Sequence, residues 1–153
     1  MGKIFSNREL IDDIICGSEV CRLALAVDDH PYLVPMSFGY NGDAIFVHTA
    51  QQGKKIDYFE TNNRVCFEFE RHVHPLPNPK SACNWSFSFE SVIGYGTIHE
   101  LTEDEDKAYA LKQIVHHYAG TQPDFQDTSL KKVRVWKISI DSMTARSSRK
   151  DQP

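Results

Sequence analysis

Motifs that define several well-known protein classes are missing from the 153-residue sequence. Its four cysteines form no C-x-x-C pair, which excludes a zinc ribbon and a thioredoxin-like motif. Neither G-x-G-x-x-G nor G-x-x-x-x-G-K-S/T occurs, so a dinucleotide-binding fold and a P-loop are unsupported. The G-x-S-x-G turn of many serine hydrolases is absent as well.

Long apolar runs and an excess of positive charge are also missing. No apolar stretch approaches the length of a membrane-spanning helix, and the opening residues MGKIFSNREL lack the apolar core of a secretion signal. We therefore expect no membrane partner and a cytoplasmic protein, whose cysteines stay as buried, reduced thiols. The net charge of −4, from 17 basic and 21 acidic residues, argues against a nucleic-acid partner.

The composition that remains suits one compact, β-rich unit. A chain of this length is enough for one domain and hardly for two, so we expect a single domain over residues 1–153. Aromatic residues make up 11% of the chain, with nine Phe and six Tyr, which suits a β-heavy core or a flat ligand.

Apolar periodicity and turn residues predict the order of the elements. Capping boxes at Ser6/Glu9 and Thr102/Glu105 predict the starts of the first and last helices. Helices are expected at 7–16, 53–62 and 103–120. Strands are expected at 20–27, 32–40, 44–49, 64–71, 86–101 and 133–140.

Proline and glycine refine this prediction. Pro35 indicates that 32–40 is an edge strand or contains a bulge, and NGD at 41–43 predicts a hairpin turn. The first three strands should therefore form an antiparallel meander, whereas three prolines predict an irregular loop at 72–80. Gly94 and Gly96 suggest a bulge or a close backbone approach. The pattern predicts a small antiparallel barrel with helices on its outside.

The stretch HTAQQGKK, 48–55, is the first candidate site. His48 and Thr49 offer polar groups at the end of a strand, Gly53 permits close backbone approach, and Lys54 and Lys55 begin a helix. Positive charge at a helix N-terminus is unfavourable unless an anion such as phosphate binds there. Two simply solvated lysines are the alternative.

Other clusters have both functional and purely structural explanations. The segment PMSF, 35–38, could offer free backbone groups to a heterocycle, or could be an ordinary edge strand. Trp136 and Arg146 could be a core residue and a surface residue. His72 and His74 are spaced like strand ligands, but no carboxylate or cysteine spacing completes a metal site, so we expect no metal.

Together, these segments resemble the flavin-binding split-barrel superfamily of pyridoxamine 5′-phosphate oxidase, in the branch related to nitroimidazole-resistance proteins. The resemblance covers about residues 8–148. It is carried by CRLALAVDDHPYLVPMSFGYNGDAIFVHTAQQGKKIDYFETNNRVCFEFE, by SVIGYGTIHEL, and by the pair Trp136 and Arg146. It implies an FMN-binding split β-barrel, mainly β and antiparallel, of Greek-key type, with about six or seven strands. It also implies a homodimer that holds each FMN in a groove between the subunits.

The resemblance assigns roles to particular residues. PMSF would border the flavin ring, residues 48–50 would line it, and the two lysines would hold its phosphate. Ser91 would approach from the barrel wall, while Trp136 and Arg146 would close over the flavin from the partner subunit. The implied cofactor-binding residues are Pro35, Met36, Ser37, Phe38, His48, Thr49, Ala50, Gly53, Lys54, Lys55, Ser91, Trp136 and Arg146. His48 is also the catalytic candidate.

The function implied is that of an FMN-dependent oxidoreductase that reduces a small flat or nitro-aromatic substrate. RSSRK, 146–150, lacks the histidine of the Arg-x-His substrate signature of pyridoxamine-phosphate oxidases, which argues against vitamin B6 oxidation. One alternative is a non-enzymatic barrel that binds or senses haem or a flavin, with His72, His74 or His99 as an iron ligand. Another is an adaptor for protein or nucleic acid.

Overall fold

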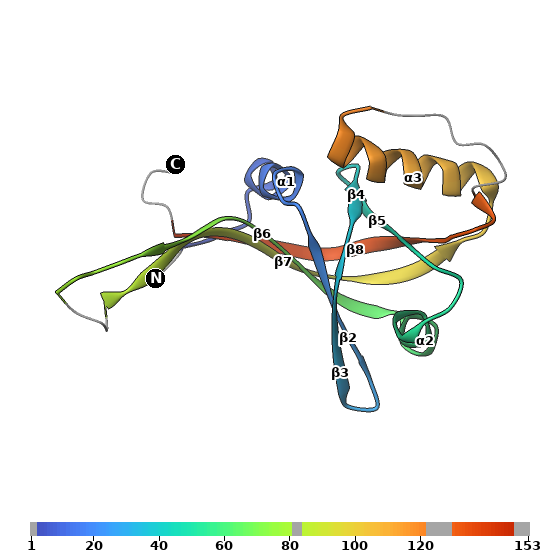
Figure 1. The fold of residues 1–153 in the computed structure, drawn as a ribbon, viewed down its shortest axis with the longest axis horizontal. Helices are drawn as coiled ribbons and strands as arrows, with labels where there is room; N and C mark the ends of the chain where they lie inside the picture. Colours follow the sequence, from blue (N-terminus) through green and yellow to red (C-terminus); the bar gives the residue numbers. More distant parts are fainter. Residues whose placement is uncertain (1–2, 81–83, 122–129, 149–153) are drawn as a thin grey trace.

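The computed structural model describes residues 3–80, 84–121 and 130–148. Within them, eight strands form one antiparallel sheet accompanied by three helices (Figure 1). The strands are β1 Lys3–Phe5, β2 Cys21–Val27, β3 His30–Met36, β4 Phe38–Tyr40, β5 Ala44–Thr49, β6 Arg64–Leu76, β7 Ser86–Leu101 and β8 Arg134–Ser147. The helices are α1 Arg8–Cys16, α2 Lys54–Thr61 and α3 Asp104–Ala119.

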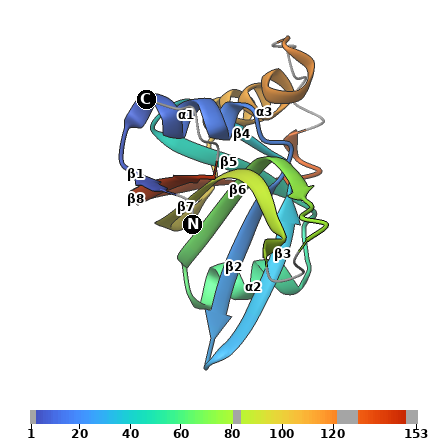
Figure 2. The same cartoon turned by 90° about the vertical axis from the view of Figure 1, so that its left-hand side faces the viewer.

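The strand order makes the sheet roll up. It runs β3-β2-β6-β7-β8-β5-β4, with β1 paired to β8, so β3 and β4 are the two ends of the sheet. Only Ser37 separates these strands in the chain. Two residue steps span about 7 Å, so the two ends of the sheet must come close together. This closure produces the antiparallel barrel that the sequence predicts, with α1 and α3 on the opposite side of β7 and β8 from α2 (Figures 1 and 2).

The predicted meander of the first three strands is wrong. The segment 32–40 is broken at Ser37, and its two halves pair at opposite ends of the sheet, β3 with β2 and β4 with β5. Pro35 has no N–H to donate, and β3 is indeed an edge strand, as expected. Hairpin turns are local features of the sequence. The passage of the chain from β3, at one end of the sheet, to β4, at the other end, depends on the closure of the whole barrel.

Two tight turns form the β2–β3 and β4–β5 hairpins. Asp28 and Asp29 both have positive φ, 47° and 59°, as a type I′ turn requires. In the second hairpin, the Asn41 side-chain oxygen accepts hydrogen bonds from the backbone N–H groups of Asp43 and Ala44, at 3.0 and 2.9 Å. The turn expected at 41–43 is therefore confirmed.

Strands β6 and β8 extend beyond their predicted limits, whereas β7 has the predicted bounds 86–101. β6 continues to Leu76, so the expected irregular loop is wrong for residues 72–76, where pairing with β7 resumes at His74 after a bulge. β8 runs to Ser147 because it keeps pairing with β7 and gains β1 on its other side. Cross-strand partners supply the hydrogen bonds here, and local sequence does not reveal them.

Gly94 and Gly96 mark the close approach that the sequence suggests. A Cβ added at Gly94 would lie 2.3 Å from the ring of Phe67, and one at Gly96 would lie 2.4 Å from the carbonyl oxygen of Ser139. The register between β7 and β8 also shifts between Tyr95 and Gly96. Side chains at these positions would separate the packed strands.

The first helix is capped one residue later than predicted. Asn7, and not Ser6, is the N-cap, and its side-chain oxygen accepts from the backbone N–H groups of Glu9 and Leu10. Asparagine caps a helix at least as well as serine, and the capping-box pattern alone does not take Asn7 into account. Gly17 ends the helix where expected.

The predicted capping box of the last helix is also wrong. The N-cap of α3 is Glu103, without a side-chain cap bond among the described residues, and the Thr102 hydroxyl instead donates to the Glu103 carboxylate at 3.4 Å. Three acidic residues in the first turn of α3 complement the helix dipole without a capping box.

Apolar side chains form two packed clusters. The larger one fills the barrel and combines α1 and α2 with the inward faces of the strands. The smaller one lies between α3 and the strands β5 and β8, and contains Ala44, Phe46, Ala110, Leu111, Ile114, Leu130 and Val135. No helix within the described residues is both long and apolar enough to cross a membrane.

The cysteines match the expectation of buried free thiols only in part. Cys16, Cys21 and Cys66 are unpaired, and Cys21 is buried. Cys16 is exposed, because it lies on the solvent side of α1, and Cys66 is half-buried. Cys83 lies outside the described residues.

Candidate functional site

The N-terminus of α2, which is the positive end of the helix dipole, has no side-chain cap among the described residues. Strand β5 ends at Thr49, and Gly53 leads into α2 with φ 145°, a conformation that favours glycine. Within the described part of the chain, no side chain caps this helix, and a Cβ at Gly53 would meet no atom within 4 Å. An anion could therefore approach the first N–H groups of the helix closely.

The two lysines at this helix start lie on different sides of it. The Lys54 ammonium is 4.8 Å from the centroid of the Tyr32 ring and 5.7 Å from that of Tyr58. Lys55 is half-buried and lies close enough to His48 for its charge to lower the pKa of that imidazole. The same helix end thus carries one cation toward β3 and one toward the end of β5.

His48 is a half-buried histidine with an unsatisfied nitrogen. Its Nδ1 is buried and has no hydrogen-bond partner among the described residues. Burial, followed by the positive charge of Lys55, lowers the pKa of His48 below its usual value. Buried polar atoms are normally paired, so this neutral imidazole has capacity for a ligand contact.

Thr49 and Ala50 are held by the core through Trp136. The Trp136 Nε1–H donates to Thr49 Oγ1 at 3.1 Å, and the Thr49 hydroxyl donates to the Ala50 carbonyl at 2.9 Å. Trp136 is only 3% exposed and packs edge-on against Phe59 of α2, with ring centroids 5.0 Å apart. Its ring therefore faces the interior of its own protomer, although the resemblance implied that it would cover a partner's flavin.

Arg134 is a residue that the sequence did not single out. Its guanidinium lies 4.7 Å from the Trp136 ring, and it pairs with Glu100 of β7 and with Glu60 of α2, the latter at 2.7 Å. Arg134 thus links β8, on which it lies, to β7 and to α2. The sequence places an arginine two residues before Trp136. It does not reveal the ion pairs of this arginine, because Glu60 and Glu100 are distant in the chain.

The residues of PMSF lie at the crossing between the sheet ends. Met36 and Phe38 point inward and are buried, whereas Pro35 and Ser37 are exposed. The backbone N–H of Phe38 donates to the Tyr118 hydroxyl at 3.2 Å, which ties the crossing to α3. Phe38 pairs with Val47, and these two residues are the chain neighbours of Ser37 and His48.

Ser91 and Arg146 lie together but far from the remaining predicted residues. They are paired across β7 and β8. Trp136 and Arg146 are ten residues apart on β8, a separation of roughly 30 Å along an extended strand. One protomer therefore brings together residues 48–55 with PMSF and Trp136, and leaves Ser91 and Arg146 at the other end of the sheet.

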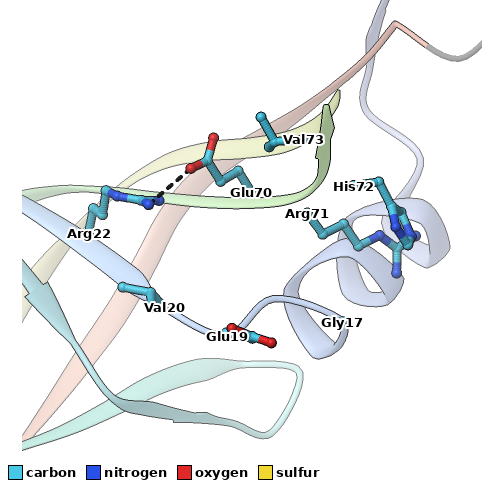
Figure 3. Close-up of a pocket in the computed structure, with 8 residues that line it drawn as sticks. All are labelled: Gly17, Glu19, Val20, Arg22, Glu70, Arg71, His72 and Val73. Carbon is cyan, nitrogen blue, oxygen red and sulfur yellow. Dashed lines mark ion pairs between the residues drawn. The ribbon is translucent and has the colours of Figure 1, made fainter. Parts of the chain in front are cut away.

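A separate hollow lies at the bulge of β6, and its lining includes none of the predicted flavin residues (Figure 3). Its volume is about 460 Å³. Arg22 pairs there with Glu70 at 2.9 Å, and Arg71 pairs with Glu90 at 2.8 Å. Because both cations already have carboxylate partners, we place the candidate site at the start of α2, where the lysine charges have no ion pair among the described residues.

Comparison with known proteins identifies the family. The family model described as pyridoxamine 5′-phosphate oxidase matches residues 7–147. The chain therefore belongs to the pyridoxamine 5′-phosphate oxidase family, as the resemblance indicated.

Solved structures support the same fold. A candidate 5-nitroimidazole antibiotic resistance protein from Bacteroides thetaiotaomicron is 29% identical, with a TM-score of 0.84 over 95% of this chain and 87% of that one. An FAD- and haem-binding protein from Mycobacterium smegmatis is 18% identical, with a TM-score of 0.82 over 99% and 77%. An FAD-binding protein from Mesorhizobium loti is 21% identical, with a TM-score of 0.71 over 97% and 99%. The split-barrel fold is thus confirmed.

A curated relative gives less information. An uncharacterized protein from Rhizobium meliloti is 29% identical over 62 residues, which are 40% of this chain. The match spans 40% of the length of that relative.

Proposed function

We propose that this protein is a flavin-dependent oxidoreductase that acts on a small flat or nitro-aromatic substrate. FMN is the smallest flavin that carries the phosphate which the start of α2 could bind. The observation that carries the proposal is an uncapped helix N-terminus with two lysines, beside a buried and unpaired His48 Nδ1, in a chain of this family.

The charges at the start of α2 fit a phosphate. Lysines at a helix N-terminus oppose the helix dipole by about 0.3–1 kcal/mol each, and a bound dianion would reverse that sign. The N–H groups of the first turn would donate to the same anion. Gly53, Lys54 and Lys55 are the residues that we assign to the phosphate.

The flavin ring would lie toward His48 and the β3–β4 crossing. Bound there, a flavin would supply the hydride or electron transfer, and the protein would bind and orient it. His48 would offer a neutral imidazole to the cofactor or substrate, and residues 35–38 would offer backbone groups. Because the pKa of His48 is lowered, its imidazole is neutral near pH 7.

A homodimer would complete this site. The outward face of the sheet carries Ser91 and Arg146, and it also carries large exposed apolar side chains. Register places Leu33, Ala24, Cys66 and Tyr95 in one row across four strands, so they share a face. The apolar side chains on this face are Leu33 62%, Phe87 55%, Ile93 46% and Tyr95 54% exposed. Exposed apolar patches of this kind are typical of interfaces.

The proposal is tested first by the visible spectrum of the purified protein and by FMN titration. We expect flavin absorbance, or a rise in melting temperature when FMN is added to apoprotein. A colourless protein that gains no stability from FMN would contradict the proposal. A Soret band that disappears after substitution of His72, His74 or His99 would favour the haem-binding alternative.

The phosphate assignment has its own test. In the double variant Lys54→Ala/Lys55→Ala, FMN should bind about 100-fold more weakly, because two charge-assisted contacts are lost. Riboflavin lacks the phosphate and should bind both forms with nearly equal affinity. Equal losses for FMN and riboflavin would show that the lysines act on something other than the phosphate.

A further inference from the structure

Helix α3 lies directly on strand β4 (Figure 1). A Cβ added at Gly39 would lie 2.5 Å from backbone atoms of both Gln113 and Ile114, so only a glycine allows this close contact. Gly39 is two residues beyond Ser37, where the chain crosses from β3 to β4. The placement of α3 therefore bears on the placement of the crossing.

The Tyr118 hydroxyl, in the last turn of α3, connects the crossing to another part of the chain. It accepts a hydrogen bond from the backbone N–H of Phe38 at 3.2 Å and donates one to the carbonyl oxygen of Glu19 at 2.8 Å. Burial raises the pKa of Tyr118, so the phenol keeps the proton that it donates. One side-chain group thus joins the first residue of β4 to the segment between α1 and β2.

The neighbouring residue His117 holds the same phenylalanine through its ring. The His117 ring centroid lies 4.1 Å from that of Phe38, and His117 Nε2 is 2.8 Å from the carbonyl oxygen of Ser18. Phe38 is fully buried and also packs against Phe69, with ring centroids 4.7 Å apart. The last turn of α3 therefore fixes both the backbone and the side chain of Phe38.

These contacts bear on the flavin site because Ser37 lies outside the strand pairing. The pairing of β3 with β2 ends at Met36, and the pairing of β4 with β5 begins at Phe38. Ser37 is exposed, and its backbone groups are among those that segment 35–38 would offer to a flavin ring. Binding groups need supporting contacts that hold them within about 0.5 Å of the productive geometry. The contacts on Phe38 supply that support next to Ser37.

We propose that Tyr118 is a positioning residue of the flavin site, whose hydroxyl fixes the backbone around Ser37 for contact with the flavin ring. The inference rests on the flavin site proposed above. Tyr118 acts through Phe38 and not through contact with the cofactor. Because the crossing serves the ring and the start of α2 serves the phosphate, loss of the Tyr118 hydroxyl should weaken FMN and riboflavin alike.

Tyr109 provides a matched control on the same helix. Tyr118 and Tyr109 are each 48% exposed. Their rings pack edge-on against a buried phenylalanine, Phe38 and Phe46 respectively. The Tyr109 hydroxyl accepts a hydrogen bond from Asn41 at 3.1 Å, in the turn between β4 and β5. Tyr109→Phe thus removes a hydroxyl contact of α3 that does not involve the crossing.

Titration of the apoprotein with FMN and with riboflavin, followed by flavin fluorescence, tests the inference. Tyr118→Phe should bind both flavins roughly fivefold more weakly than the wild type, because the support of the crossing loses its hydrogen bonds. The long-wavelength absorption band of the bound flavin should also shift, since the polar edge of the ring meets a displaced backbone. Tyr109→Phe should match the wild type in both affinities and in the spectrum.

Thermal melting without flavin separates positioning from a purely structural role. A lower melting temperature of Tyr118→Phe, together with wild-type flavin affinities and spectrum, would overturn the inference. Equal losses of flavin affinity in Tyr109→Phe would also overturn it, because they would reflect a general effect of α3.

The two flavins separate this inference from the site on which it rests. In Tyr118→Phe, a loss of FMN affinity that riboflavin does not share would assign the effect to the phosphate and overturn the positioning role. All of these results leave the flavin site itself in place. A wild-type protein that binds neither flavin overturns both the site and the inference.

Discussion

Single residues at the start of α2 combine features that are unfavourable without a ligand. His48 has a buried, unpaired Nδ1, and two lysines stand at the positive end of a helix. A structural role alone would leave both features uncompensated, and functional sites are where such local conflicts are expected. The structure thus sharpens the sequence argument, because the unpaired nitrogen is visible only once the strands are packed.

The lowered pKa of His48 predicts a pH dependence of stability. Because the pKa in the folded state lies below the ordinary value of 6.5, the unfolded chain binds more protons as the pH falls. Folding should therefore lose stability as the pH falls through 6.5, and His48→Gln should remove this contribution. Urea denaturation at pH 7.5 and pH 5.5, without added flavin, measures it.

Comparing the wild type with His48→Gln removes the contribution of other titrating groups to the pH dependence of stability. Wild type and His48→Gln share those groups, so only the difference between their pH responses reports on His48. Identical responses of the two proteins would contradict the buried, neutral histidine.

At the level of the elements, a side-chain cap fixes the start of α1. The cap of α1 is Asn7, with hydrogen bonds of 2.9 and 3.3 Å to the N–H groups of Glu9 and Leu10. Helix α1 buries Ile11, Ile14 and Ile15 in the barrel core. Loosening its first turn should therefore lower the stability of the whole barrel.

Asn7→Ala should lower the free energy of unfolding by about 1 kcal/mol, because two backbone N–H groups lose their acceptor. Ser6→Ala is the matched control one residue earlier, and it should cost little. Chemical denaturation of both variants measures the difference. A larger loss for Ser6→Ala would restore the capping box that the sequence pattern suggested.

For the whole molecule, the exposed outward face of the sheet predicts a dimer. Ile93 is 46% exposed on β7, two residues from Ser91 and on the same face. Ile93→Lys would place a charge in the proposed interface, where it would have to be desolvated. We expect the wild type to run as a dimer in light scattering and the variant to run at half that mass.

The same variant should bind FMN more weakly, since Arg146 would no longer reach the partner's site. Tyr109→Lys is a control at a similar exposure, 48%, on α3 and away from this face. It should leave the dimer and the FMN affinity unchanged. A dimer that tolerates Ile93→Lys would place the interface elsewhere.

Some of these features follow from the sequence because their causes are local. Val65, Phe67 and Phe69 alternate along β6, a pattern that indicates one buried face, and all three are buried. The turn at 41–43 was predicted by residues that form it with their own side chains. The cluster of residues 48–55 was recognisable because glycine and lysines break the local rules for a helix start.

Only the tertiary structure decided how these pieces meet. The break at Ser37, the extension of β6 and β8, and the pairing of Arg134 with Glu60 and Glu100 all depend on segments distant in the chain. The same holds for the separation of Arg146 from His48 and for the opposite directions of Lys54 and Lys55. Sequence determines which residues turn, pair and alternate, whereas barrel closure sets their distances, because non-local packing selects one arrangement among many compatible with those local preferences.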